Sequence, residues 1–151
     1  MSNCSLMLLR VPKSLKKIQT FRTTSGSYLL CLKVTSPFSI SVGSLGIVDF
    51  RKGGYLYCGS ACKNLGARLA RHLKKDKKMH WHIDYMTSRE QVKVSVIRIF
   101  PVGKKSECGL NLQVQQLPGA KTVSKFGCSD CSCSSHLTFF KRLPAQAIDR
   151  L

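Results

Sequence analysis

YLYCGSACKNLGARLARHLKKDKK, residues 55–78, places a short strand pattern directly before a helix pattern. The leucines at 65, 69 and 73 recur every four residues, which predicts an amphipathic helix over 63–78. Either Ser60 or Asn64 is expected to cap its start. The apolar and aromatic run Tyr55–Cys58 predicts a strand. This stretch therefore predicts a strand followed directly by a helix that packs through its leucines and exposes its basic residues.

Similar patterns extend outward from this stretch. Alternating or β-branched runs predict strands over 26–34 and 92–100, and a hairpin made from 38–42 and 45–50. A compact aromatic segment, 79–88, is expected to form a short helix. A second amphipathic helix is expected over 105–117, with Leu110, Val114 and Leu117 as its apolar stripe. This mixture predicts the α+β class rather than a parallel α/β sheet. We expect a basic extension over 1–23, one domain over 24–141 and a tail over 142–151.

Composition narrows the class of partner. The 151 residues carry 25 Lys and Arg against 7 Asp and Glu, a formal charge of +18. This charge favours a polyanionic partner, with nucleic acid ahead of an anionic membrane surface, although a merely soluble basic protein has the same composition. The chain has no apolar run long enough to span a membrane. Its 8 cysteines come without a signal-peptide pattern, which predicts a reducing compartment, the cytoplasm. The acid-free residues 1–25 also fit an organelle transit peptide.

Five residues stand out as candidates for chemistry, and each has a plainer alternative. Glu107 lies on the apolar stripe of its predicted helix, so it needs either a basic partner or a divalent cation. Tyr28 and Tyr57 lie on predicted strands, where most tyrosines only pack. Arg68 borders the leucine stripe and either binds a phosphate or snorkels to water. His72, one turn later, either joins the same anion or packs as a neutral ring.

Further residues form candidate binding groups. The basic face of the helix over 63–78 predicts nucleic-acid contacts from Lys63, Arg71, Lys74, Lys75 and Lys78. The four side chains Cys128, Cys131, Cys133 and His136 have the spacing C-x₂-C-x-C-x₂-H. Three thiolates and an imidazole suit a structural zinc ion, and buried free thiols beside a hydrogen-bonded histidine are the alternative. His82 and Asp84 are secondary candidates. His82 is a ligand or proton carrier, with a packed aromatic hinge as the favoured alternative, and Asp84 either orients His82 or caps a helix.

These scattered residues together match a known pattern. The segments that carry the match are 26–28, 57–61, 64–72, 81–85, 107–108, 118–119 and 127–137. Together they resemble the GIY-YIG nuclease superfamily over residues 24–141, in an uncharacterised branch found as stand-alone proteins or fused to endonuclease-three-type DNA glycosylases. The resemblance implies a small antiparallel sheet flanked by helices, with Tyr28 and Tyr57 on adjacent strands. Ser27 and Cys58 replace the central isoleucines of the two motifs, and residues 35–53 form an inserted hairpin between them.

The resemblance also implies a division of roles. Tyr28 would act as the general base or orient the attacking water, and Tyr57 would support it. Arg68 would hold the scissile phosphate beside His72, and Glu107 would bind Mg²⁺ or Mn²⁺. A tyrosine acts as a base near neutral pH only where cations depress its pKa.

The expected function is therefore a divalent-metal-dependent DNA endonuclease, with a DNA-repair glycosylase as a candidate partner. A catalytically idle nucleic-acid-binding module and a zinc- or thiol-dependent interaction protein are the alternatives.

Overall fold

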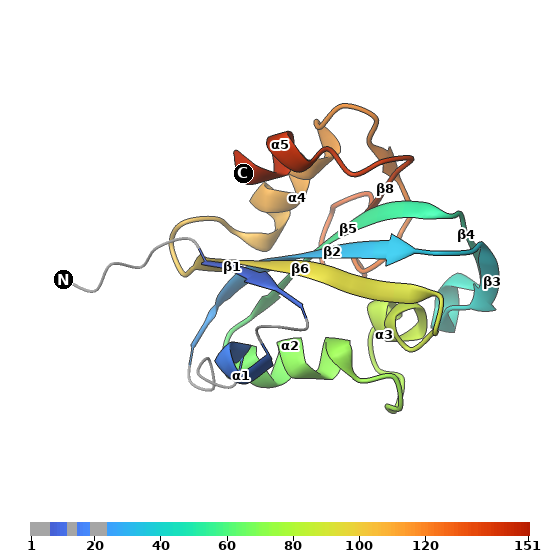
Figure 1. Cartoon of the computed structure of the whole chain (residues 1–151), viewed down its shortest axis with the longest axis horizontal. Helices are drawn as coiled ribbons and strands as arrows, with labels where there is room; N and C mark the ends of the chain where they lie inside the picture. Colours follow the sequence, from blue (N-terminus) through green and yellow to red (C-terminus); the bar gives the residue numbers. More distant parts are fainter. Residues whose placement is uncertain (1–6, 12–14, 19–23) are drawn as a thin grey trace.

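A six-stranded antiparallel sheet forms the centre of the molecule (Figure 1). The computed structural model describes residues 7–11, 15–18 and 24–151. In order across the sheet the strands are β1 (Met7–Arg10), β6 (Val92–Pro101), β2 (Gly26–Val34), β5 (Gly53–Ala61), β8 (Leu137–Phe140) and β7 (Lys121–Thr122). Two further strands, β3 (Phe38–Ser41) and β4 (Ile47–Phe50), pair only with each other. The α+β class and the inserted hairpin expected from the sequence are confirmed.

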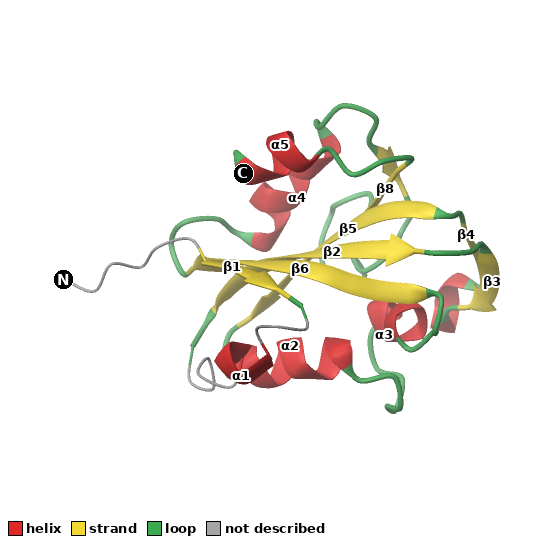
Figure 2. Ribbon diagram, viewed as in Figure 1, coloured by secondary structure: helices red, strands yellow, loops and turns green. Residues whose placement is uncertain are grey.

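Helices cover both faces of the sheet (Figure 2). One face carries α1 (Leu15–Ile18), α2 (Leu65–Leu73) and α3 (His82–Thr87), and the other carries α4 (Glu107–Gln115) and α5 (Ala145–Asp149). Successive strand residues point to opposite faces, so β2 feeds two separate cores. Tyr28 and Leu30 pack with Leu69 of α2, whereas Leu29 packs with Leu110 of α4.

The predicted elements form, but the helices are shorter than expected. Strand β2 has the predicted limits, and the predicted hairpin is present as β3 and β4. Helix α2 begins at Leu65 because the Asn64 side chain caps it, accepting a hydrogen bond from the backbone nitrogen of Ala67 at 3.3 Å. It ends at Leu73 because the Lys74 backbone is extended. The basic residues that follow therefore lie on a loop, not on a longer helix.

Both ends of the described chain contribute to the core more than the sequence suggested. Strand β1 pairs with β6, and Leu9 and Ile18 are buried, although the sequence predicts only a basic extension over 1–23. Near the other end, Ile148 of α5 is buried and its carbonyl accepts a hydrogen bond from the Arg98 guanidinium. Residues 1–6, 12–14 and 19–23 lie outside the described part, as do Cys4 and most of the predicted extension. Among the described helices, none is long and apolar enough to cross a membrane.

Candidate functional site

A pocket of about 640 Å³ opens where strand β8 stops covering the edge of β5. The ladder between β5 and β8 ends at the pair Tyr57 and Leu137, and one further backbone bond joins Cys58 to His136. Beyond that point the chain on this side is a loop rather than a strand, which leaves room for side chains. All five residues expected to act together line this pocket: Tyr28, Tyr57, Arg68, His72 and Glu107.

The two tyrosines are diagonal neighbours on one face of the sheet. Tyr28 of β2 lies opposite Gly59 of β5, and Leu30 lies opposite Tyr57. The Tyr28 ring lies over Gly59, where a Cβ atom would come within 2.4 Å of the phenol oxygen. Gly59 therefore has to be glycine for the ring to lie there. The expectation that the inserted hairpin still leaves Tyr57 beside Tyr28 is confirmed.

Tyr28 is joined to a buried histidine. Its hydroxyl oxygen lies 2.6 Å from Nε2 of His72, in a hydrogen bond whose donor depends on the imidazole tautomer. Burial lowers the pKa of His72 to about 3, so the ring is neutral at physiological pH. Burial also raises the pKa of Tyr28 well above its ordinary value, and the nearby Arg68 only partly opposes this rise. Arg68 by itself therefore does not depress the pKa of this phenol, since desolvation outweighs its effect.

Arg68 is held against the pocket wall. Its guanidinium donates to the backbone carbonyl of Ser60, and its central carbon lies 4.5 Å from the centroid of the Trp81 ring. A cation over an indole face is attracted by the ring quadrupole. These two contacts orient the guanidinium and leave its other N–H groups available, so Arg68 does not simply extend into solvent.

Glu107 links the pocket to a second group of residues. It is the first residue of α4, a helix that Ser106 caps by accepting from the Gly109 nitrogen at 3.0 Å. Oε2 of Glu107 accepts a hydrogen bond from the Ser60 hydroxyl, and Oε1 lies 2.7 Å from Nδ1 of His136. Burial alone would raise the pKa of Glu107, but the contacts with His136 and Ser60 lower it overall. The partner of this carboxylate is thus a histidine and a serine, not one of the abundant lysines or arginines.

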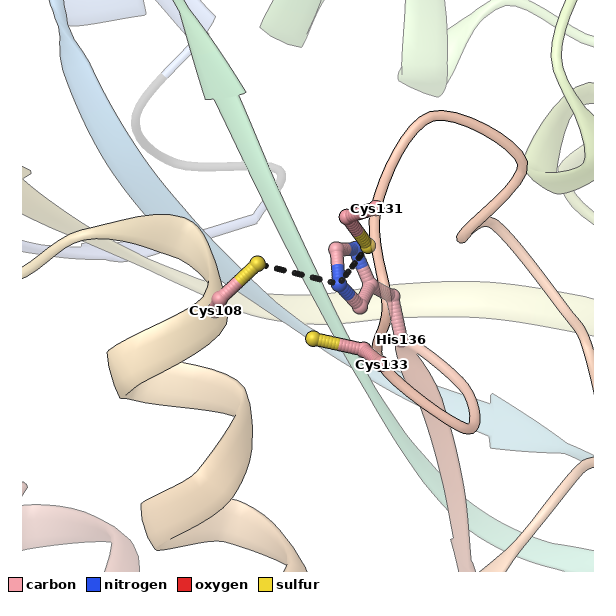
Figure 3. A group of neighbouring side chains, drawn as sticks. All are labelled: Cys108, Cys131, Cys133 and His136. Carbon is pink, nitrogen blue, oxygen red and sulfur yellow. Dashed lines mark hydrogen bonds between the residues drawn. The ribbon is translucent and has the colours of Figure 1, made fainter.

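The second group is a cluster of three thiols and an imidazole (Figure 3). Cys108 comes from α4, while Cys131, Cys133 and His136 come from the loop before β8. Their sulfur and nitrogen atoms all lie within 4.8 Å of one another, so the cluster could hold a metal ion. The expected ligand Cys128 is not a member. Its carbonyl accepts from the Cys131 nitrogen at 3.4 Å, in the turn that leads into the cluster, and Cys108 takes its place.

One comparison with known proteins gives a result. The family model described as "Domain of unknown function DUF123" matches residues 27–150. The chain belongs to the DUF123 family. No curated protein matches the chain, and no solved structure matches it. The DUF123 match runs from β2 to α5, so it includes every residue of the pocket and of the cysteine cluster.

Within this DUF123 domain the expected basic face divides into two groups. Lys63 is exposed at the pocket, and Lys74 and Lys78 are exposed beyond α2. Arg71 instead forms an ion pair of 2.9 Å with Asp84, and the Lys75 ammonium donates to three backbone carbonyls, those of Thr87, Arg89 and Val92. Arg71 and Lys75 are thus engaged within the domain, and contacts of the five residues with nucleic acid stay a prediction.

The two secondary candidates also differ in their positions. His82 lines the pocket, where its Nδ1 accepts from the Gly127 nitrogen at 3.0 Å, and burial lowers its pKa. Asp84 is fully buried away from the pocket and accepts from the backbone nitrogens of His80 and Trp81 at the start of α3. Of the alternatives considered for Asp84, capping a helix is therefore the one observed.

Sequence reasoning missed three residues of the DUF123 site. Ser60 forms hydrogen bonds with both Arg68 and Glu107. The Arg68 guanidinium stacks on the Trp81 ring, and Cys108 completes the cysteine cluster. Each lies within a segment that carries the resemblance, but adjacency in a motif does not reveal which side chain faces which. Only the fold shows that the start of α4 reaches the loop before β8.

Proposed function

We propose that this DUF123 protein is a divalent-metal-dependent nuclease that hydrolyses phosphodiester bonds of DNA. The observation that carries the proposal is the meeting of two tyrosines, an arginine, a histidine and a carboxylate in one pocket, although they come from β2, β5, α2 and α4. The resemblance to the GIY-YIG superfamily supports the same reaction, since it assigns catalytic roles to these positions. The formal charge of +18 supports a polyanionic substrate.

Substrate binding in this proposal depends on two basic side chains of the pocket. Arg68 presents a guanidinium already oriented by Ser60 and Trp81, and a planar fork of this kind suits a phosphate. Lys63 is exposed at the same pocket and adds a positive charge where the sugar-phosphate backbone of the nucleic acid would enter. Preformed orientation lowers the conformational entropy lost on binding. We therefore assign the scissile phosphate to Arg68 and an adjacent phosphate to Lys63.

Tyr28 orients the attacking water rather than ionising. The phenol is 1% exposed and its pKa is raised by burial, so a free phenolate is disfavoured near neutral pH. Whichever of Tyr28 and His72 donates in their hydrogen bond, the phenol oxygen can make one further hydrogen bond on the pocket side. Tyr57, on the same face one strand away, can support the water or the phosphate in the same manner.

Glu107 fits a divalent cation that is shared with the substrate. Mg²⁺ is usually held by one or two carboxylates together with substrate phosphates and water, and Glu107 is a half-buried carboxylate that lines the pocket. Its lowered pKa keeps it ionised, as a cation ligand requires. A bound ion would offset negative charge on the phosphate oxygens and lower the pKa of a bound water. Ser60 and His136 hold the carboxylate in place for this role.

The proposal is tested with labelled duplex, branched, nicked and single-stranded DNA, and with RNA, in the presence of Mg²⁺ or Mn²⁺. The decisive variant is Tyr28→Phe, with Tyr55→Phe as the matched control. Tyr55 lies on the same face of the sheet, but its hydroxyl is bonded to the Arg51 backbone outside the pocket. Tyr28→Phe is expected to reduce cleavage by about 10²-fold, because the water loses its orientation, while leaving affinity for DNA unchanged. Tyr55→Phe is expected to cleave normally.

Two results would contradict the proposal, the first its activity and the second the role of Tyr28. Salt-dependent binding without metal-dependent cleavage of any substrate would leave an idle nucleic-acid-binding module. Undiminished cleavage by Tyr28→Phe would remove this tyrosine from the reaction. Glu107→Ala is expected to abolish cleavage as well, and its bound metal has to be measured in the same preparation because Glu107 also contacts His136.

A further inference from the structure

We propose that Cys108, Cys131, Cys133 and Nε2 of His136 bind one structural zinc ion, with Glu107 as the outer carboxylate that fixes the histidine. The inference does not depend on the proposed nuclease activity. It gives the cysteine cluster an occupant, replaces the ligand set expected from sequence spacing, and gives Glu107 a role besides lining the pocket.

The spacing of the four ligand atoms suits a tetrahedral ion. Zinc takes thiolate sulfur at about 2.3 Å and imidazole nitrogen at about 2.0–2.1 Å, so tetrahedral geometry separates sulfur from nitrogen by about 3.6 Å and sulfur from sulfur by about 3.8 Å. Nε2 of His136 lies 3.4 Å from the Cys131 sulfur and 3.8 Å from the Cys108 sulfur. All four atoms lie within 4.8 Å of one another, and Figure 3 shows the side chains pointing toward a common centre.

The chemistry of the donors selects zinc over the hard cations. Three thiolates and an imidazole are soft or borderline ligands, whereas Mg²⁺ and Mn²⁺ prefer carboxylate, carbonyl and water oxygens. A set of four protein ligands closes the coordination sphere, as in structural zinc sites, and leaves no position for a substrate. The ligands also come from two separate elements, the start of α4 and the loop before β8, so the ion would cross-link them.

Glu107 completes the arrangement of a zinc-bound histidine. When one nitrogen of a histidine binds a metal, the other usually donates its hydrogen to a carboxylate, which fixes the ring orientation. Here Nε2 faces the sulfurs while Nδ1 lies 2.7 Å from Oε1 of Glu107. The other carboxylate oxygen accepts from Ser60 at the pocket. The ion would therefore hold Glu107 in position through His136.

Bonds that need no metal already hold the ligand loop. The backbone nitrogen of His136 donates to Phe126 at 2.7 Å, and its carbonyl accepts from Cys58 of β5 at 3.1 Å. Asn111, buried in α4, donates to the Ser135 carbonyl at 2.6 Å. Single cysteine variants are thus expected to fold, which makes the loss of metal measurable on a folded protein.

The first test measures zinc in protein purified without a histidine tag and under reducing conditions. We expect one zinc per chain, released by a strong chelator with the appearance of three additional reactive thiols. Cys108→Ser is expected to lose zinc, and the matched control Cys128→Ser is expected to retain it. Cys128 follows the sequence spacing of the loop but is outside the cluster, so the pair separates the structural ligand set from the sequence-predicted one.

The second test addresses Glu107 and does not require activity. Competition with a chromogenic chelator is expected to give a zinc affinity about 10–100-fold lower for Glu107→Gln than for the natural chain. Asp130→Asn is the matched control, since it removes a negative charge beside Cys131 without contacting His136. Equal losses in both variants would contradict the assigned role, because charge alone would then explain the effect.

The zinc assignment itself has clear contrary outcomes. Zinc well below one per chain in reduced, metal-replete protein would overturn it. So would retention of zinc by Cys108→Ser together with its loss from Cys128→Ser. Thiols that become reactive on reduction, but not on chelation, would show that the cluster forms a disulfide instead. None of these results decides the nuclease proposal, which stands or fails on metal-dependent cleavage of nucleic acid.

Discussion

Asp84 shows how a single buried charge joins two helices of this fold. Its side chain is fully buried, yet Oδ2 accepts hydrogen bonds from the Arg71 guanidinium of α2 and from two backbone nitrogens at the start of α3. Burial alone would raise the pKa of this carboxyl, but the hydrogen bonds outweigh it and lower the pKa. Asp84 therefore stabilises the fold in its ionised form and positions Trp81, on which Arg68 lies.

The lowered pKa predicts how stability depends on pH. Because the pKa is lower in the folded state than in the unfolded chain, Asp84 contributes stability above its unfolded pKa of about 3.9, and this contribution is lost as the pH falls through the folded value. At neutral pH, Asp84→Asn is expected to lower the free energy of unfolding by about 2 kcal/mol. The difference from the natural chain is expected to shrink below about pH 4. Urea denaturation between pH 3 and 7 measures both effects.

A matched variant makes this measurement specific. Asp49→Asn removes an exposed carboxylate on the hairpin and is expected to change stability by less than about 0.5 kcal/mol at every pH. If the gap between Asp84→Asn and the natural chain stayed constant down to pH 3, the ionised form of Asp84 would not be what stabilises α2 against α3.

At the scale of elements, the lysines that follow α2 link the end of this helix to α3 and to the start of β6. Lys75 donates to the carbonyls of Thr87, Arg89 and Val92, and Lys77 donates to the last carbonyls of α2. Helix ends leave carbonyls without intrahelical partners, and nearby lysines can satisfy them. Burial lowers the pKa of Lys77 to about 8, as expected for an ammonium held inside the fold. Part of the basic charge is thus used to hold elements together.

The neighbouring Lys74 and Lys75 give a direct comparison of the two uses of charge. Lys75→Ala is expected to lower the free energy of unfolding by about 1–3 kcal/mol, because three carbonyl contacts lose their donor. Lys74→Ala removes the same charge from an exposed position and is expected to change stability by less than about 0.5 kcal/mol. Chemical denaturation at constant ionic strength distinguishes them. Equal stability of the two variants would contradict the structural role of Lys75.

Periodicity predicted the elements better than it predicted their contacts. The strand over 26–34 and the leucine stripe of α2 follow from repeats of two and of about four residues, which depend only on which face is buried. The ion pair of Arg71 with Asp84 and the carbonyl partners of Lys75 involve segments ten or more residues away. Residue type alone predicted a solvated basic face, since nothing local shows that a carboxylate and three carbonyls lie within reach.

The same limit explains the error in the cysteine cluster. The spacing of Cys128, Cys131, Cys133 and His136 suggested a site built from one loop, because sequence distance was the only available measure of proximity. In the fold, α4 packs on the face of the sheet opposite to α2 and its first turn brings Cys108 to that loop, while Cys128 belongs to the preceding turn. By contrast, the meeting of Tyr28 and Tyr57 was predictable, because the resemblance implies that they lie on adjacent strands. The structure adds that Gly59 lies opposite Tyr28 and leaves room for its ring.

On the scale of the whole molecule, the net positive charge and the pocket contribute to binding in different ways. A charge of +18 attracts any polyanion, so binding to nucleic acid by itself says little about the pocket. Under the proposed function, the pocket adds a defined position for individual phosphates, because Lys63 and Arg68 lie there while other lysines are exposed elsewhere. Phosphate contacts release counterions, and each contact contributes separately to the salt dependence of binding.

Salt titration therefore separates a specific pocket from diffuse attraction. The logarithm of the DNA-binding constant falls linearly with the logarithm of salt concentration, with a slope of about −0.9 for each phosphate contacted. Lys63→Ala is expected to weaken binding and to reduce the size of this slope by about 1. Lys33→Ala removes an equal charge near the opposite end of β2, where Lys33 pairs with Gly54 and Lys93, and is expected to leave the slope unchanged. If both variants lowered the slope equally, the backbone of the nucleic acid would be held by the overall charge of the molecule, and the pocket would lose its assigned role in binding.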